Sequence, residues 1–474
     1  WDLEVDLGRR GTELSVRPIE LRPVRGLSPR PFLGLVGFDC VVFMSGKNHL
    51  FVRSSDVCMQ FGANGPDGQD WRVPVSEIVA RRKRVSDSLA SEGMQSVIVE
   101  DPVELYWLTG GRQRGILVVG ATDSGVETTH WVRKSLSRAR WESGGDDAPD
   151  SLCDQPRSSM LEDGLRGIGV TEVPAMLQDS LPTARWSFLS DCLSSLSPSN
   201  HNASPIIHKL REVKSDWEID QIRTSGSVNQ KMFSQISKEC QVGMTELEVA
   251  SIAEKVSRRE GFGGRIRMRR WPMDCDRAVI VTGRSGGVPS FFDSAVGGFG
   301  SNPIAPLGSG HRRIKEAEPV LVDLVHVHRG YVSDCTRMYS FGNLSQDWLA
   351  RLDDMAEIRG SLIDALNKGE SCARAWELGR DMALEMGYED NLMGIAPHQA
   401  KFLGHSVGLE LDETPVLADR FIEPMIPGNT MAIEPKVVYA DGAIGTEDTW
   451  YCTKEGLKCL TGGSDIPDHT ELSV

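Results

Sequence analysis

The stretch VDLVHVHRGYVSDCTR, from Val322 to Arg337, contains two runs of alternating apolar residues on either side of Gly330. This pattern predicts two antiparallel strands joined by a tight turn. Asp323 and Asp334 would then lie on one face, with their carboxylates close together across the strands. Facing buried acids repel each other and become protonated unless a cation lies between them. Taken alone, the stretch favours the simpler interpretation that Asp334 caps a turn.

Three further ionisable residues interrupt apolar strand-like runs nearer the C-terminus. They are His405 in GHSVGLEL, Glu434 in MAIEPKVV and Glu447 in TEDTWYCT. Burying these groups and the two aspartates separately would be costly, because each would need its own partner. Four carboxylates and one imidazole form a reasonable ligand set for two divalent metal ions. An oxygen-rich set favours Mn²⁺, Fe²⁺ or Co²⁺ over the zinc of thiolate sites.

The composition of the 474-residue chain is that of a globular protein, with 40% hydrophobic and 25% charged residues. A net charge of −15 argues against nucleic acid or an anionic membrane as a partner. No apolar run reaches the roughly 18–20 residues that a membrane span needs, and we expect no signal peptide. The ten cysteines are scattered without a Cys-x-x-Cys pair, which favours reduced thiols and a cytoplasmic location.

The chain is too long for one ordinary core and is expected to form two main domains. We expect an uncertain, poorly packed extension over 1–72, and α/β structure over 73–208 with a surface loop near 143–164. Residues 209–465 are expected to be α+β, an antiparallel sheet covered by helices on one face, followed by a tail at 466–474. Ser215 and Glu218 predict a capping box at the start of a long helix.

Several phrases of the chain resemble the M24 pita-bread metallopeptidases, a superfamily that includes aminopeptidase P, prolidase and creatinase. These phrases are LVDLVHVHRGYVSDCTRMYSFG, GHSVGLELDETPVL, IPGNTMAIEPKVV and TEDTWYCTKEGLKCLT, with ELYWLTG and LREVKSDWEIDQIR upstream. The resemblance covers about residues 73–465. It implies a pita-bread catalytic domain behind a smaller creatinase/prolidase-type α/β domain, and a homodimer.

The resemblance also implies roles for the five candidate ligands. Asp323 would hold one metal ion, Asp334 and Glu447 would bridge both, and His405 and Glu434 would complete the second site. Two such ions lower the pKa of a shared water. Glu434 is the family's candidate proton shuttle, which makes Glu434 and His405 the principal catalytic candidates.

The pattern departs from proline-specific relatives at two helper histidines. One position, seven residues after His405, is Asp412, a third candidate for the catalytic site. The other falls near Ser290 in VTGRSGGVPSFFDS, which contains no histidine. At position 412, an aspartate in place of the histidine would favour a cationic or amino group of the substrate over an oxyanion. Further candidates for substrate contact share a positive or titratable side chain: Arg267 or Arg269 as a carboxylate clamp, and Lys401 or His398 as shifted helpers.

These observations predict a dinuclear metal-dependent hydrolase of the Xaa-Pro aminopeptidase or dipeptidase type, acting on a small peptide. A first alternative keeps the metal centre but changes the substrate to a non-peptide small molecule, as in a lyase or an amidinohydrolase. A second alternative is a catalytically inert module that binds peptides or partner proteins. Five intact candidate ligands argue against the inert module.

Overall fold

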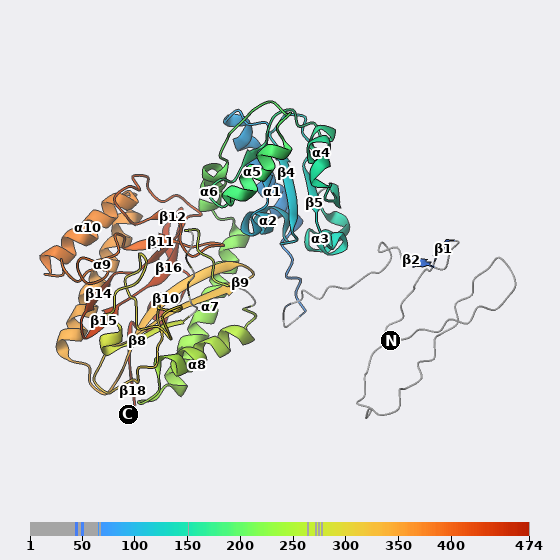
Figure 1. The fold of residues 1–474 in the computed structure, drawn as a ribbon. Coiled ribbons are helices and arrows are strands. Elements are labelled where there is room, and N and C mark those ends of the chain that lie inside the picture. Colours follow the sequence, from blue (N-terminus) through green and yellow to red (C-terminus); the bar gives the residue numbers. More distant parts are fainter. Residues whose placement is uncertain are drawn as a thin grey trace, which may run out of the picture. The chain divides into compact units, whose positions relative to one another are not determined.

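The computed structural model describes residues 43–45, 49–51, 65, 68–149, 151–262, 265–270, 273, 275 and 278–473 (Figure 1). The chain divides into two compact units, residues 1–59 and 60–474. In the first unit, the description covers an antiparallel pair, β1 (Phe43–Ser45) and β2 (His49–Phe51). Most of the predicted extension over 1–72 therefore lies outside the described residues. Among the helices that the structure describes, none combines the length and apolar content of a membrane span.

The second unit begins with an α/β domain built on a five-stranded sheet in the order β6-β5-β4-β3-β7. Strands β3 and β4 are apolar runs, and their alternating side chains enter two different cores. Val97 and Val119 face helices α1 and α2, whereas Ile98 and Val118 face α4 and α5. The strands are β3 (Ser96–Val99), β4 (Gly115–Gly120), β5 (Thr129–Val132), β6 (Ser151–Asp154) and β7 (Ala175–Met176). The helices are α1 (Val75–Ser91), α2 (Pro102–Thr109), α3 (Leu136–Glu142), α4 (Leu161–Gly167), α5 (Thr183–Cys192) and α6 (Ser204–Glu212).

The prediction of a surface loop over residues 143–164 is wrong in part. Strand β6 lies inside this range and pairs in parallel with β5 at the edge of the sheet, and α4 begins before the range ends. Of the four β6 residues, Leu152 is the one whose side chain is buried. An edge strand with a single buried residue has no apolar alternation by which the sequence could reveal it.

In its described residues, the C-terminal domain contains two sheets and a two-stranded ribbon, where the sequence predicted a single antiparallel sheet. One sheet has the order β18-β10-β9-β8, the other has the order β12-β11-β13-β16-β17, and β14 pairs with β15. The strands are β8 (Ala278–Thr282), β9 (Val320–His328), β10 (Tyr331–Phe341), β11 (Gly404–Ser406), β12 (Glu413–Val416), β13 (Thr430–Ile433), β14 (Lys436–Tyr439), β15 (Gly442–Gly445), β16 (Asp448–Thr453), β17 (Gly456–Cys459) and β18 (His469–Leu472). The helices are α7 (Asp216–Glu239), α8 (Glu246–Arg259), α9 (Gln346–Asn367) and α10 (Cys372–Glu385).

Three helices pack directly on these strands, and α10 packs on α9. Helices α7 and α8 pack against β8, β9 and β10, and α9 packs against β14, β15 and β17 (Figure 1). The predicted capping box at the start of α7 is confirmed: Ser215 Oγ accepts from the Glu218 amide, and the Glu218 carboxylate accepts from the Ser215 amide. The predicted hairpin is also confirmed, as β9 and β10 pair antiparallel around Arg329 and Gly330.

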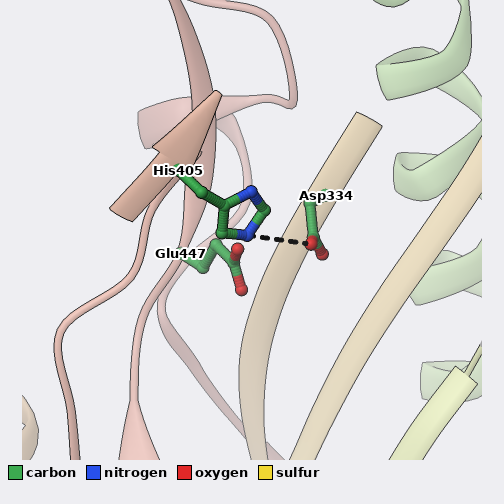
Figure 2. A group of neighbouring side chains, drawn as sticks. All are labelled: Asp334, His405 and Glu447. Carbon is green, nitrogen blue, oxygen red and sulfur yellow. Dashed lines mark ion pairs between the residues drawn. The ribbon is translucent and has the colours of Figure 1, made fainter. Parts of the chain in front are cut away.

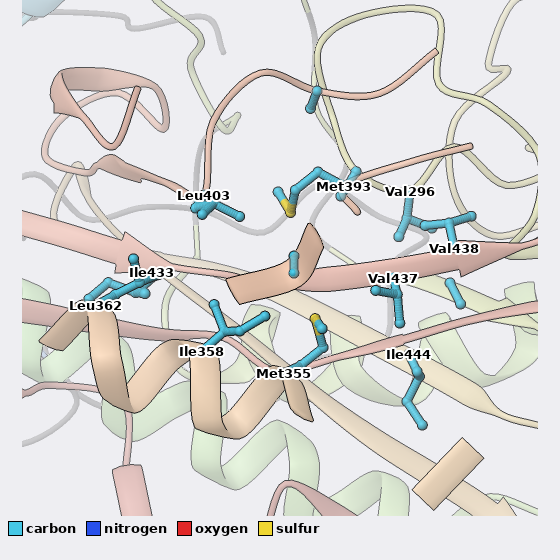
Figure 3. Packing of buried hydrophobic residues seen from close by; sticks show 14 of the residues in the cluster. Val296, Met355, Ile358, Leu362, Met393, Leu403, Ile433, Val437, Val438 and Ile444 are labelled. Carbon is cyan, nitrogen blue, oxygen red and sulfur yellow. The ribbon is translucent and has the colours of Figure 1, made fainter. Parts of the chain in front are cut away.

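The strand-like run MAIEPKVV is interrupted at Pro435, and its two halves belong to different sheets. Proline lacks the amide proton that a central strand would need, which favours this break. On either side of the break, Ile433 and Val437 pack into one hydrophobic core with Met355 and Ile358 of α9 (Figure 3). The core therefore holds the backbone of Glu434, Pro435 and Lys436 between two anchored apolar residues.

A buried charge cluster connects the α/β domain to the loop that follows His405. Arg211 of α6 donates to Glu104 of α2 at 2.5 Å, to Glu410 at 2.9 Å and also to Glu413. Lys214 Nζ lies 3.0 Å from the second oxygen of Glu413. All five side chains are largely or fully buried. Removing one partner from such a cluster leaves uncompensated buried charge.

Glu413 should make the stability of this protein fall in acid. Burial raises the pKa of Glu413, but the charges of Arg211 and Lys214 lower it more, to well below its ordinary value of 4.5. A carboxyl group whose pKa is depressed by folding stabilises fully above its unfolded pKa, and the contribution is lost as pH falls towards the folded pKa. We therefore expect the free energy of unfolding, measured with urea, to fall steadily below about pH 4.5.

The matched variant is Glu413→Gln, which cannot titrate. It should be less stable than the wild type at neutral pH and should lose less stability between neutral and acidic solution. An acid slope in Glu413→Gln equal to that of the wild type would show that other carboxyl groups dominate the effect.

Candidate metal centre

Five separate segments bring the predicted ligands together. Asp323 lies on β9 and Asp334 on β10, where Asp334 is paired with Val325 and Asp323 with Thr336. The two acids are thus diagonal neighbours on one face of the hairpin rather than directly opposite residues. The remaining candidates are His405 on β11, Glu434 immediately after β13, and Glu447 immediately before β16.

The side chains of Asp334, His405 and Glu447 converge on one point (Figure 2). One ligand atom from each residue lies within 4.8 Å of the others. His405 Nε2 lies 3.8 Å from Asp334 Oδ2 and 3.3 Å from Glu434 Oε1, which brings the Glu434 carboxylate to the same place. Asp323 stands at the margin of the group, and its side chain is 22% exposed.

Two carboxylate oxygens of this group lack a hydrogen-bond partner among the described residues. They are Asp334 Oδ1 and Glu447 Oε1, and both belong to buried side chains. A buried oxygen without a donor is costly, and a cation removes that cost. Carboxylate oxygens with one imidazole nitrogen are suitable ligands for a first-row divalent ion. The residues present therefore fit one divalent metal ion between Asp334, His405, Glu434 and Glu447.

Lys436 lies inside the same cluster, and the sequence analysis missed it. Its Nζ is 2.6 Å from Glu434 Oε2, 2.8 Å from Glu447 Oε2 and 3.7 Å from Asp323 Oδ2. The lysine side chain is 1% exposed. The signal that could have revealed it is its spacing: residues two apart on a strand point to the same face, and Lys436 follows Glu434 by two within an apolar run.

The pKa values follow from this distribution of charge. Burial lowers the pKa of His405, but its hydrogen bond to Glu434 and the nearby carboxylates raise it more, to about 9. Burial raises the pKa of Glu447 to about 7 although Lys436 opposes the shift, and burial with carboxylate neighbours raises that of Asp334 strongly. Glu434 contacts two cationic groups, and they outweigh its burial and lower its pKa to about 2. Negative charge at Asp334 and Glu447 thus needs further neutralisation.

Two threonine side chains hold the ligands in place. Thr336 Oγ1 donates to Glu447 Oε2 at 2.7 Å, on the same oxygen that Lys436 binds. Thr449 Oγ1 accepts from the Asp334 amide and donates to the Asp334 carbonyl, which fixes the backbone of that ligand. Supporting contacts of this kind orient metal ligands before the ion binds.

Comparison with known proteins agrees with this geometry. Residues 220–454, which include all five candidate ligands, match the model of metallopeptidase family M24. The chain belongs to this family. It is 25% identical over 292 residues to a probable dipeptidase PepE of Mycobacterium tuberculosis, covering 61% of this chain and 68% of the relative. It is 28% identical over 258 residues to an uncharacterized peptidase of Staphylococcus aureus, covering 54% of this chain and 64% of the relative.

Solved structures extend the likeness to both domains. An Xaa-Pro dipeptidase from Bacillus anthracis superposes with a TM-score of 0.69 and 17% identity, covering 84% of this chain and all of that one. The dipeptidase PepE from Mycobacterium ulcerans gives 0.67 and 21% identity, covering 85% of this chain and all of that one. At these identities the likeness concerns the fold. The predicted arrangement, a pita-bread M24 domain after a smaller α/β domain, is confirmed.

Asp412, which the sequence comparison with proline-specific relatives singled out, is bound to the segment at 265–270. Its carboxylate accepts from the Arg269 amide at 2.5 Å and from the Arg270 amide at 3.2 Å, and forms an ion pair with the Arg270 side chain. Arg269 itself is paired with Glu410 at 3.0 Å. Both side chains are therefore held in protein contacts, and their roles in the M24 substrate pocket stay predictions.

The other candidates for substrate contact also stay predictions. Arg267 is half-buried, and its carbonyl accepts from the Leu411 amide. Ser290 Oγ accepts from the Phe292 amide, so this hydroxyl supports a turn. Lys401 and His398 are exposed.

Proposed function

We propose that this chain is a metal-dependent M24 peptidase of the Xaa-Pro type, cleaving small peptides at the bond before proline. The observation that carries this proposal is the convergence of Asp334, His405 and Glu447 around carboxylate oxygens that no described donor satisfies. The names of the structural neighbours supply the substrate class, because they include Xaa-Pro dipeptidases. The proposal covers two forms: a dipeptidase that splits Xaa-Pro dipeptides, and an aminopeptidase that releases the first residue of a longer Xaa-Pro peptide.

Asp334, His405, Glu434 and Glu447 would hold the ion. Bound there, a divalent ion would polarise the substrate carbonyl and activate water for attack. Glu434 has one oxygen towards His405 and the other towards Lys436, so its carboxylate is fixed at the centre of the cluster. A carboxylate held in this way can accept a proton from water and return it to the leaving nitrogen.

The experiment is a substrate panel on the purified protein supplemented with Mn²⁺ or Co²⁺. We expect Xaa-Pro dipeptides or Xaa-Pro-Yaa tripeptides to be cleaved with a kcat/KM at least about tenfold above that of the matched Xaa-Ala peptides. A chelator should abolish turnover, and the added metal should restore it.

The same panel separates the alternatives. Equal cleavage of Xaa-Ala and Xaa-Pro peptides would remove the proline preference and leave a general dipeptidase. Metal-loaded protein that cleaves no peptide would contradict the proposed function. It would favour a non-peptide substrate. The replacement of a helper histidine by Asp412 already suggests such a change of substrate. Homodimer formation and a cytoplasmic location remain proposals for sedimentation and for localisation experiments.

A further inference from the structure

The Lys436 ammonium lies among three carboxylates of the candidate metal centre. It makes short contacts with one oxygen of Glu434 and one oxygen of Glu447, and Asp323 lies on its third side. Two of these three acids, Asp323 and Glu447, are among the ligands expected for the ion on the Asp323 side of the centre. Charge-assisted hydrogen bonds of 2.6–2.8 Å are strong.

The lysine and a metal ion cannot share these oxygens. Divalent ions bind carboxylate oxygens at about 2.0–2.2 Å, so an ion held by Glu434 Oε2 and Glu447 Oε2 would need the space that Nζ fills. Of the remaining oxygens, Glu434 Oε1 and Asp334 Oδ2 face His405, and Asp334 Oδ1 and Glu447 Oε1 have no donor among the described residues. The two halves of the cluster therefore differ: one already contains a cation, and the other still needs one.

The side chain of Lys436 is built into the fold rather than laid across the surface. It is paired with Gly445 in the β14–β15 ribbon, and a Cβ atom at Gly445 would lie 2.5 Å from Lys436 Cγ. The missing side chain at Gly445 thus provides the room through which the lysine stem reaches the cluster. Val437, the next residue, is fully buried in the core beside α9.

We propose that the Lys436 ammonium replaces the metal ion on the Asp323 side, so that this chain binds a single divalent ion through Asp334, His405, Glu434 and Glu447. M24 enzymes use a centre of two divalent ions. In this chain the protein itself supplies the second positive charge, and it does so at a fixed position. The inference rests on the proposed metal site but not on the proposed substrate.

Metal stoichiometry tests this directly, without any substrate. Purified wild-type protein is titrated with Mn²⁺ by calorimetry, and its metal content is measured by mass spectrometry after removal of excess ion. We expect one tightly bound Mn²⁺ per wild-type chain and two per chain in Lys436→Ala, because the substitution frees three carboxylates. The double variant Lys436→Ala/Asp323→Ala should return to one. Lys454→Ala, which removes an exposed lysine of the same domain, should also bind one.

Asp323→Ala alone gives a further discriminating result. If Lys436 fills the Asp323 side, this variant still binds one Mn²⁺, whereas Asp334→Ala binds none. Two ions in the wild type, none in the wild type, or one ion in folded Lys436→Ala would each overturn the inference.

A spectroscopic measurement on the unmodified protein covers the case in which Lys436→Ala does not fold. A single bound Mn²⁺ gives an isolated six-line electron paramagnetic resonance signal at saturation, and a pair of ions close together gives an exchange-coupled spectrum. The six-line signal supports the inference and the coupled spectrum refutes it. Since no peptide is present, a failure to cleave Xaa-Pro substrates would leave this result unchanged and would concern the proposed function alone.

Discussion

Replacing His405 with alanine is expected to abolish peptide hydrolysis and metal binding together. His405 supplies the one nitrogen in the group of converging ligands, and its Nε2 faces both Asp334 and Glu434. Without the imidazole, these carboxylates lose both a ligand partner and a hydrogen-bond donor. We expect kcat/KM on the best peptide to fall by about three orders of magnitude or more, with metal content near zero.

The matched control is His311→Ala, because His311 is an exposed histidine of the same domain. It should retain both metal and activity. Thermal unfolding of His405→Ala in the presence of a chelator shows whether the variant is folded. A folded His405→Ala protein with full metal content and unchanged kcat/KM would refute the assignment of His405 as a ligand.

The substitution Glu434→Gln is expected to produce the second large effect. The side chain keeps its shape but can no longer accept a proton, and general acid–base groups contribute about 10²–10⁴ in rate. We therefore expect kcat to fall by about this factor, with KM changed much less. Contacts with Lys436 and His405 outweigh burial and lower the pKa of Glu434 to about 2, so this carboxyl group is ionised in neutral solution.

The control for this variant is Glu423→Gln, an exposed glutamate on the segment leading to β13. Steady-state kinetics should leave kcat and KM of the control unchanged. A Glu434→Gln enzyme with kcat within a few-fold of the wild type would exclude Glu434 as the proton-transfer group. A large rise in KM with kcat unchanged would give it a binding role instead.

Much of the C-terminal domain could be predicted from the sequence, because short local patterns indicate its strands and helices. Alternation around Gly330 predicted the β9–β10 hairpin, and the Ser215–Glu218 pair predicted the start of α7. Helix α9, residues 346–367, carries a similar local signal, because its apolar residues recur at helical spacing. The five ionisable groups were noticed because each interrupts an apolar run, and the structure brings them to one place.

Other features depend on contacts between distant segments, which local patterns do not contain. Strand β6 forms through pairing with β5 alone, and its side chains carry little apolar signal. The separation of β13 from β14 follows from Pro435, but the sheet that each half joins is decided by remote partners. Lys436 was not predicted because a lysine near a strand end is usually solvated, and the room for its buried side chain depends on Gly445 of the neighbouring strand.

The salt-bridge cluster around Arg211 bears on how this protein can be divided. A fragment limited to the family segment, residues 220–454, would retain Glu410 and Glu413 but omit Arg211 and Lys214. Of their described cationic partners only Arg269 would remain, so these two acids would lose most of the positive charge that neutralises them in the whole chain. The evolutionary module and the unit of folding therefore do not coincide, and the shortest self-sufficient polypeptide must begin upstream of α6.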